Sequence, residues 1–206
     1  MLKKLFAAFM STFLVLSVPF ASAQDVAPDE IIRKNTAEVL ALLKADKELA
    51  AGDVTKVEKM ANDKILPYFN FSRMTQLAVG RAWREATDAQ KTGLTNEFRR
   101  LLVRTYASSL SQFRNQTIDV RPLKFAATET EVVVKTVVSQ SGGTGVPLDY
   151  SMEKGKDGWK IFDVLIDGVS LVTNYRSSFA TEIKNGGIDG LVKSLADRNA
   201  KNAAKK

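Results

Sequence analysis

Two neighbouring carboxylates are the side chains whose spacing best fits acid–base chemistry. Asp163 and Asp167 lie four residues apart, on or just after a predicted strand. Paired carboxylates can act as general acid and general base when their environments differ. Because the sequence has no His and no Cys, it lacks the commonest general base, a thiol nucleophile and thiolate metal ligands. Catalysis would rest on carboxylates, Ser, Lys or Tyr. The ordinary alternative places Asp163 at a strand edge and Asp167 in a turn.

An aromatic cluster and a set of arginines are the other groups that suit binding. Residues 67–74 hold three aromatic side chains and a Met. Such a cluster ordinarily packs at a helix start, and its functional alternative is the rim of an apolar ligand cavity. Charges on helices usually face solvent, but five arginines would be able to approach a phosphate: Arg81, Arg84, Arg99, Arg100 and Arg104. The Gly-rich stretch 142–145 joins two strands instead of opening a helix, so it predicts a hairpin loop and no phosphate cradle.

Apolar residues at helical spacing predict helices through the first half of the chain. Residues 28–50 start with a proline and an acidic pair that suit a first helical turn. A second helix begins at Asp53 and stops at Pro67, and a third begins at Asn70 and ends near Gly80.

The clearest helix starts at a capping box formed by Thr87 and Gln90, and its apolar stripe extends to Phe113. Beyond it, β-branched and alternating residues predict an antiparallel meander of four strands, at 117–125, 130–139, 146–153 and 159–167. In the last strand the alternation predicts two faces, one with Trp159, Ile161 and Leu165 and the other with Phe162, Val164 and Ile166.

After a turn at Gly168 the chain is predicted to enter a final helix directly, with a break at residues 186–187. Helices, then a meander, then helices again indicate one α+β domain.

The two ends of the chain are predicted to lie outside this domain. Lys3 and Lys4 precede an apolar run and an Ala-Ser-Ala site, the pattern of a cleaved secretory signal peptide over residues 1–23. The apolar run is shorter than the roughly 20 residues that a spanning helix needs. Residues 24–196 then form a single domain, and residues 197–206 a basic, disordered tail. Without Lys3 and Lys4 the net charge falls from +7 to +5.

Four stretches, taken in their order and spacing, carry a resemblance to a known family. They read PYFNFSRM at 67–74 with LAVGRAWR at 77–84, FRRLLVRTYA at 98–107, WKIFDVLIDGVSLV at 159–172, and GGIDGL at 186–191. Over residues 28–196 the chain resembles the MlaC, or toluene-tolerance (Ttg2-type), family of periplasmic lipid carriers of Gram-negative bacteria.

The resemblance implies a phospholipid carrier that moves lipid between the outer and inner membranes and maintains outer-membrane lipid asymmetry. It also implies a twisted antiparallel sheet, cone-like as in nuclear-transport-factor and cystatin-like folds, with several helices enclosing an apolar cavity for the acyl chains. The head group would stay near solvent. Implied partners are an outer-membrane lipoprotein–porin complex and an inner-membrane ABC transporter with its MCE-domain protein. We expect a monomer with phospholipid as cargo, and no catalysis, cofactor, metal or nucleic-acid partner.

The lining of such a cavity is expected to come from the concave face of the sheet and from the covering helices. The strand residues expected to line it are Val132, Val134, Val146, Leu148, Tyr150, Phe162, Val164 and Ile166. The helix residues expected to line it, together with one residue after Gly168, are Tyr68, Phe71, Met74, Leu77, Phe98, Leu102, Tyr106, Val169, Val172, Tyr175 and Phe179. Some of these belong to ordinary core, and periodicity does not divide the two sets.

Two other functions fit the same fold. Cone-shaped sheets also occur in small isomerases and dehydratases that use a pocket carboxylate, so Asp163 acting with Tyr150 is the enzyme alternative. A lipid-free periplasmic adaptor, its cavity filled by its own side chains, is the third interpretation. Fold alone is a poor guide to activity, but the absence of His favours the carrier over the enzyme.

Overall fold

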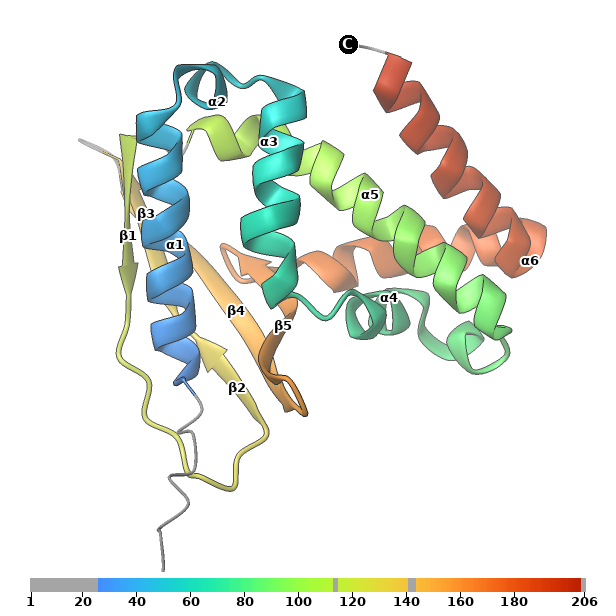
Figure 1. Cartoon of the computed structure of the whole chain (residues 1–206). Helices are drawn as coiled ribbons and strands as arrows, with labels where there is room; N and C mark the ends of the chain where they lie inside the picture. The colour runs from blue at the N-terminus through green and yellow to red at the C-terminus, as the bar shows by residue number, and fades with distance from the viewer. Residues whose placement is uncertain (1–25, 113–114, 141–143, 205–206) are drawn as a thin grey trace, which may run out of the picture.

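The computed structural model describes residues 26–112, 115–140 and 144–204 (Figure 1). The predicted signal peptide and residues 142–143 of the predicted Gly-rich loop lie outside the described residues. The helices before the sheet are α1 (Pro28–Ala45), α2 (Lys47–Ala51), α3 (Val54–Met60), α4 (Phe71–Val79) and α5 (Asp88–Gln112). Between α3 and α4 lie a short π-helix, η1 (Ala61–Ile65), and a 3-10 helix, η2 (Leu66–Tyr68), and between α4 and α5 lies a second 3-10 helix, η3 (Gly80–Arg84). The strands are β1 (Gln116–Val120), β2 (Glu131–Val134), β3 (Thr136–Gln140), β4 (Val146–Gly155), β5 (Gly158–Ile166) and β6 (Val169–Ser170), and the final helix is α6 (Leu171–Ala204).

Local sequence signals explain where the helices begin. The predicted capping box is confirmed: Gln90 N donates to Thr87 Oγ1 at 3.2 Å, and Thr87 N donates to Gln90 Oε1 at 2.9 Å. Asp46, Asp53 and Asn70 cap α2, α3 and α4 by accepting hydrogen bonds from main-chain N–H groups of the first turn. Because the first N–H groups of a helix have no partner inside it, these side chains set each start.

The strands form one antiparallel sheet in the order β1-β3-β4-β5-β6, with β2 also paired to β4. β2 and β3 run along β4 in a single register, in which Val134 is opposite Tyr150 and Val138 is opposite Val146. They are therefore the two halves of the one strand that the sequence predicts over 130–139. The predicted α+β class and meander order are confirmed, whereas the first strand ends at Val120.

A bulge in β5 corrects the predicted faces of that strand. Opposite β4, Met152 pairs with Ile161 and Tyr150 pairs with Val164, so Phe162 is the extra residue between the two register segments. A bulge reverses the alternation, because two residues of one strand face one residue of the other. Ile161 and Val164 therefore share the inner face, and the prediction that placed them on opposite faces is wrong. The Phe162 ring instead stacks under the guanidinium of Arg73, whose Cζ lies 5.4 Å from the ring centroid.

Both ends of the outer edge of β5 are paired. Near its start, Phe69 bridges Ile161, and Asn70 N donates to Ile161 O at 2.8 Å. At its end, β6 pairs with β5 through a turn at Asp167 and Gly168, both of which have positive φ. The chain thus passes through a two-residue strand before it enters α6, instead of entering the helix directly as predicted.

The apolar core is divided into three clusters. The first lies between α4, α5 and α6 around Phe98 and Phe179, whose rings meet edge to face at 5.2 Å. The second lies between α1 and the sheet around Met152 and Trp159. The third joins α1, α2 and α3 to α5 around Leu43. Figure 1 shows α4, α5 and α6 stacked beyond the β5 side of the sheet, while α1 runs beside β1 and packs against β1 and β2.

The C-terminal half of α6 is folded, which corrects the predicted disordered tail. Gly187 has a positive φ and kinks α6 at the predicted break. The helix then continues to Ala204, and Asn199 is only 1% exposed. Its Nδ2 donates to Glu97 O at 2.9 Å and to Glu97 Oε2 at 2.7 Å, and Arg104 donates to the Asn199 carbonyl oxygen. These tertiary contacts with α5 override the polar composition of the segment.

We expect Asn199→Ala to lower the free energy of unfolding by about 1–3 kcal/mol, because it leaves buried acceptors on Glu97 without their donor. Asn202→Ala in the exposed last turn is the matched control and should change it by less than about 0.5 kcal/mol. Denaturant unfolding of both variants measures the difference. Equal effects would contradict the folded arrangement of this segment.

Candidate functional site

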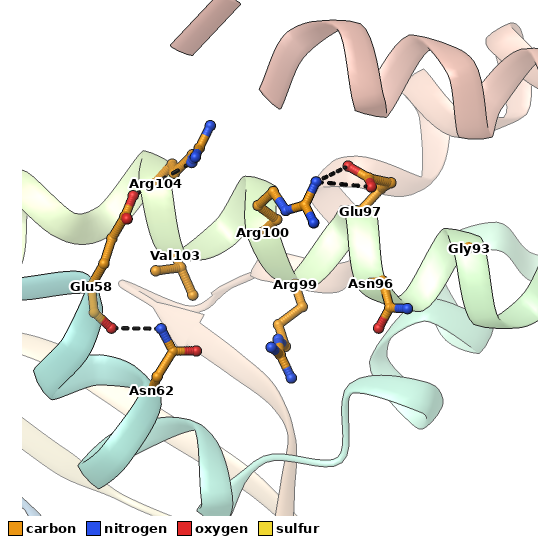
Figure 2. Close-up of a pocket in the computed structure, with 9 residues that line it drawn as sticks. All are labelled: Glu58, Asn62, Gly93, Asn96, Glu97, Arg99, Arg100, Val103 and Arg104. Atoms are coloured by element: carbon orange, nitrogen blue, oxygen red, sulfur yellow. Dashed lines mark hydrogen bonds and ion pairs between the residues drawn. The ribbon is translucent and has the colours of Figure 1, made fainter. Parts of the chain in front are cut away.

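Two adjoining hollows lie along α5. The first, of about 370 Å³, separates α3 from α5 and is drawn in Figure 2. Its lining residues are Glu58, Asn62, Gly93, Asn96, Glu97, Arg99, Arg100, Val103 and Arg104. The second, of about 410 Å³, lies beside η2 and the start of α4. Its lining residues are Leu66, Pro67, Phe69, Asn70, Phe71, Thr95, Asn96, Arg99, Asp157 and Lys160. Asn96 and Arg99 line both hollows, which therefore adjoin each other and are together called the opening.

The arginines of the first hollow differ in their partners. Arg100 pairs with Glu97 at 3.1 Å, and Arg104 Nε lies 3.4 Å from Glu58 Oε1. Arg99 forms no ion pair or hydrogen bond with any residue that the structure describes. In Figure 2 its side chain leaves α5 on a different side from those of Arg100 and Arg104. Arg99 is thus a cation available to a ligand in the opening.

The second hollow combines apolar walls with charge. Phe69 and Phe71 stack with ring centroids 5.6 Å apart, and both line the hollow. Lys160 Nζ donates to Pro67 O at 2.8 Å, which holds the ammonium at the edge of this wall. Apolar walls with a few fixed polar groups are typical of sites for amphipathic ligands.

The inner face of β4 and β5 carries a row of apolar and aromatic side chains. Tyr150 and Val164 are cross-strand partners, and Leu148 pairs with Ile166 one step further along. Val164 contacts both the first and the second core cluster. Burial raises the pKa of Tyr150 well above its ordinary value, which indicates a strongly desolvated phenol. This part of the sheet faces the region where the clusters meet.

The structure divides the predicted lining residues into three groups. Buried core residues are Met74, Phe98, Leu102, Val132, Val134, Val172 and Phe179. Half-buried residues are Tyr68, Phe71, Leu77, Tyr106, Leu148, Tyr150, Phe162, Val164 and Tyr175. Exposed residues are Val146, Ile166 and Val169, at the end of the sheet where β4 starts and β5 and β6 turn.

Of the predicted set, Phe71 alone lines either described hollow. Sequence reasoning did not include Leu66, Val103 or Lys160. Two other lining residues belong to groups that the sequence analysis named as suited to binding: Phe69 lies in the aromatic stretch 67–74, and Arg99 is one of the five arginines.

Asp163 has a structural role that accounts for its position. Its Oδ1 accepts from the N–H groups of Val164 and Val172 at 2.8 and 3.1 Å, and its Oδ2 accepts from Ser170 Oγ at 2.5 Å. Ser170 Oγ in turn accepts from Thr173 N at 3.0 Å. Asp163 therefore ties β5 to the first turn of α6.

Asp163 is also opposite Ser151 in the sheet, one step along β4 from Tyr150. Because neighbouring residues of a strand face opposite sides, the predicted catalytic pair of Asp163 and Tyr150 is not assembled. Asp167 lies in the β5–β6 turn.

Over the part of the chain that the structure describes, no helix is both long and apolar enough to cross a membrane, and no group of three or more acidic, His or Cys side chains is arranged to hold a metal ion.

Comparisons with known proteins agree on one family. The MlaC protein family matches residues 33–197. The toluene tolerance protein ttg2D of Pseudomonas putida is 26% identical over 177 residues, covering 85% of this chain and 82% of that protein. The intermembrane phospholipid transport system binding protein MlaC of Haemophilus influenzae is 21% identical over 194 residues, covering 93% and 91%. A solved structure, the phospholipid-binding protein of Ralstonia solanacearum in complex with a phospholipid, superposes with a TM-score of 0.80 at 40% identity, covering 86% of this chain and 99% of that one.

We expect Asp163→Ala to lower the free energy of unfolding by about 2 kcal/mol, because it removes the acceptor for three hydrogen bonds at the β5–α6 junction. Asp167→Asn is the control and should have an effect below about 0.5 kcal/mol, since Asn tolerates the left-handed conformation of that turn. Thermal or denaturant unfolding compares the two. An unchanged stability of Asp163→Ala would rule out this structural role.

Proposed function

Because the match to residues 33–197 spans most of the chain, this protein belongs to the MlaC family, and we propose that it is a periplasmic phospholipid carrier. The observation that carries the proposal is the 40% identity, over 86% of the chain, to a protein solved with a phospholipid bound. The name of the Haemophilus relative adds a place in intermembrane phospholipid transport. The family consists of lipid-binding transport proteins and not of enzymes, so the isomerase-like alternative is not favoured.

A carrier must replace the membrane as the solvent for two acyl chains. At about 0.8 kcal/mol per methylene, about thirty methylenes would cost on the order of 25 kcal/mol if they were exposed to water. The protein must therefore offer a long apolar surface with few unpaired donors and acceptors. The inner face of β4 and β5 and the facing helices offer such a surface.

We place the acyl chains where the first and second core clusters meet at Val164. Tyr150 and Val164 on the sheet and Tyr106 on α5 are half-buried and pack against these clusters, and Leu148 lies two residues from Tyr150 on the same face of β4. Since each cluster is packed within itself, the clusters can part to admit the chains while the elements keep their own contacts. The two hollows along α5 then form the mouth, and the head group remains near solvent.

The transport route requires docking at two membranes. As partners we propose the outer-membrane lipoprotein–porin complex and the inner-membrane ABC transporter with its MCE-domain protein. Export by a cleaved signal peptide at residues 1–23 would place the carrier between them. The positive net charge would steer it toward acidic partner surfaces.

Native mass spectrometry of the chain from residue 24 onward, followed by solvent extraction, tests lipid binding directly. The expected result is a stoichiometric adduct that extracts as diacyl phospholipid. A lipid-free mass that stays unchanged after incubation with phospholipid vesicles would instead support a lipid-free adaptor.

The placement of the acyl chains is tested by Val164→Trp. Filling the space beside Tyr150 should lower lipid occupancy about tenfold while the chain stays folded. Val133→Trp is the matched control: Val133 is 42% exposed and lies on the outer face of β2, so its lipid occupancy should equal that of the unmodified protein. Equal lipid content in both variants would argue against this location. Leu148→Arg offers a second test by placing a charge on the same inner face.

A further inference from the structure

Arg99 lies at the junction of the two hollows, where its cationic side chain is accessible to a ligand. Its guanidinium carries five N–H donors, and none of them is engaged by a residue that the structure describes. The neighbouring Arg100 and Arg104 are both occupied by carboxylates. The structure therefore leaves one free guanidinium in the opening and neutralises the two beside it.

Lys160 supplies a second cation from a different element. It projects from β5 into the second hollow, which Arg99 lines from α5. Its hydrogen bond to Pro67 O uses one of three ammonium donors and fixes the position of Nζ. Two further donors remain for a ligand, and the amide of Asn96 lies at the same junction.

We propose that Arg99 and Lys160 bind the phosphate of the phospholipid head group between them. This inference rests on the carrier function proposed above, and it assigns the polar end of the cargo to the second hollow. Guanidinium and ammonium groups are the usual partners of phosphate oxygens, with charge-assisted hydrogen bonds. Phe69 and Phe71 on the adjoining wall would then receive the glycerol and the first methylenes of the acyl chains.

The charge of the hollow favours a phosphodiester over free phosphate. Asp157 lines the same hollow, so two cationic side chains face one carboxylate, a surplus of one positive charge. A phosphodiester carries one negative charge, which this surplus balances. Inorganic phosphate carries more than one negative charge on average at neutral pH, which this surplus does not balance.

The test compares two lipids that share their acyl chains. The lipid-free chain is incubated with vesicles that contain equal amounts of dioleoyl phosphatidylglycerol and dioleoylglycerol, and the bound lipids are extracted and quantified by mass spectrometry. The unmodified protein should retain the phospholipid in preference. Arg99→Gln and Lys160→Gln should each lower the ratio of phospholipid to diacylglycerol about fivefold, with total bound lipid unchanged.

Matched controls remove the same charge outside the proposed site. Arg121→Gln removes a cation that is paired with Asp119 and lines neither hollow. Lys156→Gln removes an exposed cation of the β4–β5 turn. Both should keep the lipid ratio of the unmodified protein, and thermal unfolding verifies that all four variants fold.

The outcomes separate this inference from the carrier function. If Arg99→Gln and Lys160→Gln bind lipid with an unchanged ratio, the phosphate site is wrong and the carrier function stands. If neither the unmodified protein nor any variant binds either lipid, the carrier function itself fails. If the unmodified protein binds inorganic phosphate through Arg99 and Lys160 but shows no preference for the phospholipid, the hollow binds free phosphate and not the lipid head group.

Discussion

The antiparallel pairing of β4 with β5, including the bulge at Phe162, positions most of the features of the site. Past the bulge, Val164 faces inward beside Tyr150, although simple alternation would turn it outward. The same strand receives Asn70 at its start, supplies Asp163 to the first turn of α6, and directs Lys160 toward Pro67. Helices from both halves of the chain are thus anchored to one strand, and their spacing from the sheet follows from its geometry.

The division of the core into three clusters fits the physical demands on a carrier. One contiguous core of interdigitating side chains leaves few voids and resists insertion. Here α5 and α6 are joined by edge-to-face contacts of Phe98 with Tyr175 and Phe179, at 5.1 and 5.2 Å. The sheet and α1 are joined separately around Trp159. Packing within each cluster maintains the fold, and in the proposed carrier the surfaces between clusters would receive the cargo.

Features that arise from local chemistry could be predicted from the sequence, and features that arise from register or tertiary contact could not. The capping box at Thr87 needs only residues three apart, and the α+β order follows from the change of period along the chain. The bulge at Phe162 depends on which residues of β4 lie opposite, so the alternation in β5 gave the wrong faces. Asn199 looked like part of a solvated tail because its partner, Glu97, is distant in sequence. Arg100 has its partner Glu97 three residues earlier on the same helix, which is a local signal, whereas the place of Arg99 in the second hollow depends on the packing of η2 and β5 beside α5.

The pairing at both ends of the outer edge of β5 has a consequence for how the molecule behaves at high concentration. An open strand edge presents free N–H and C=O groups to any other strand and promotes edge-to-edge association. Here Phe69 and Asn70 block one end of that edge and β6 blocks the other. At the opposite side of the sheet, β1 is only five residues long and exposes Thr117 and Asp119. A protein that must present apolar surface to its cargo is thereby protected against aggregation through its sheet.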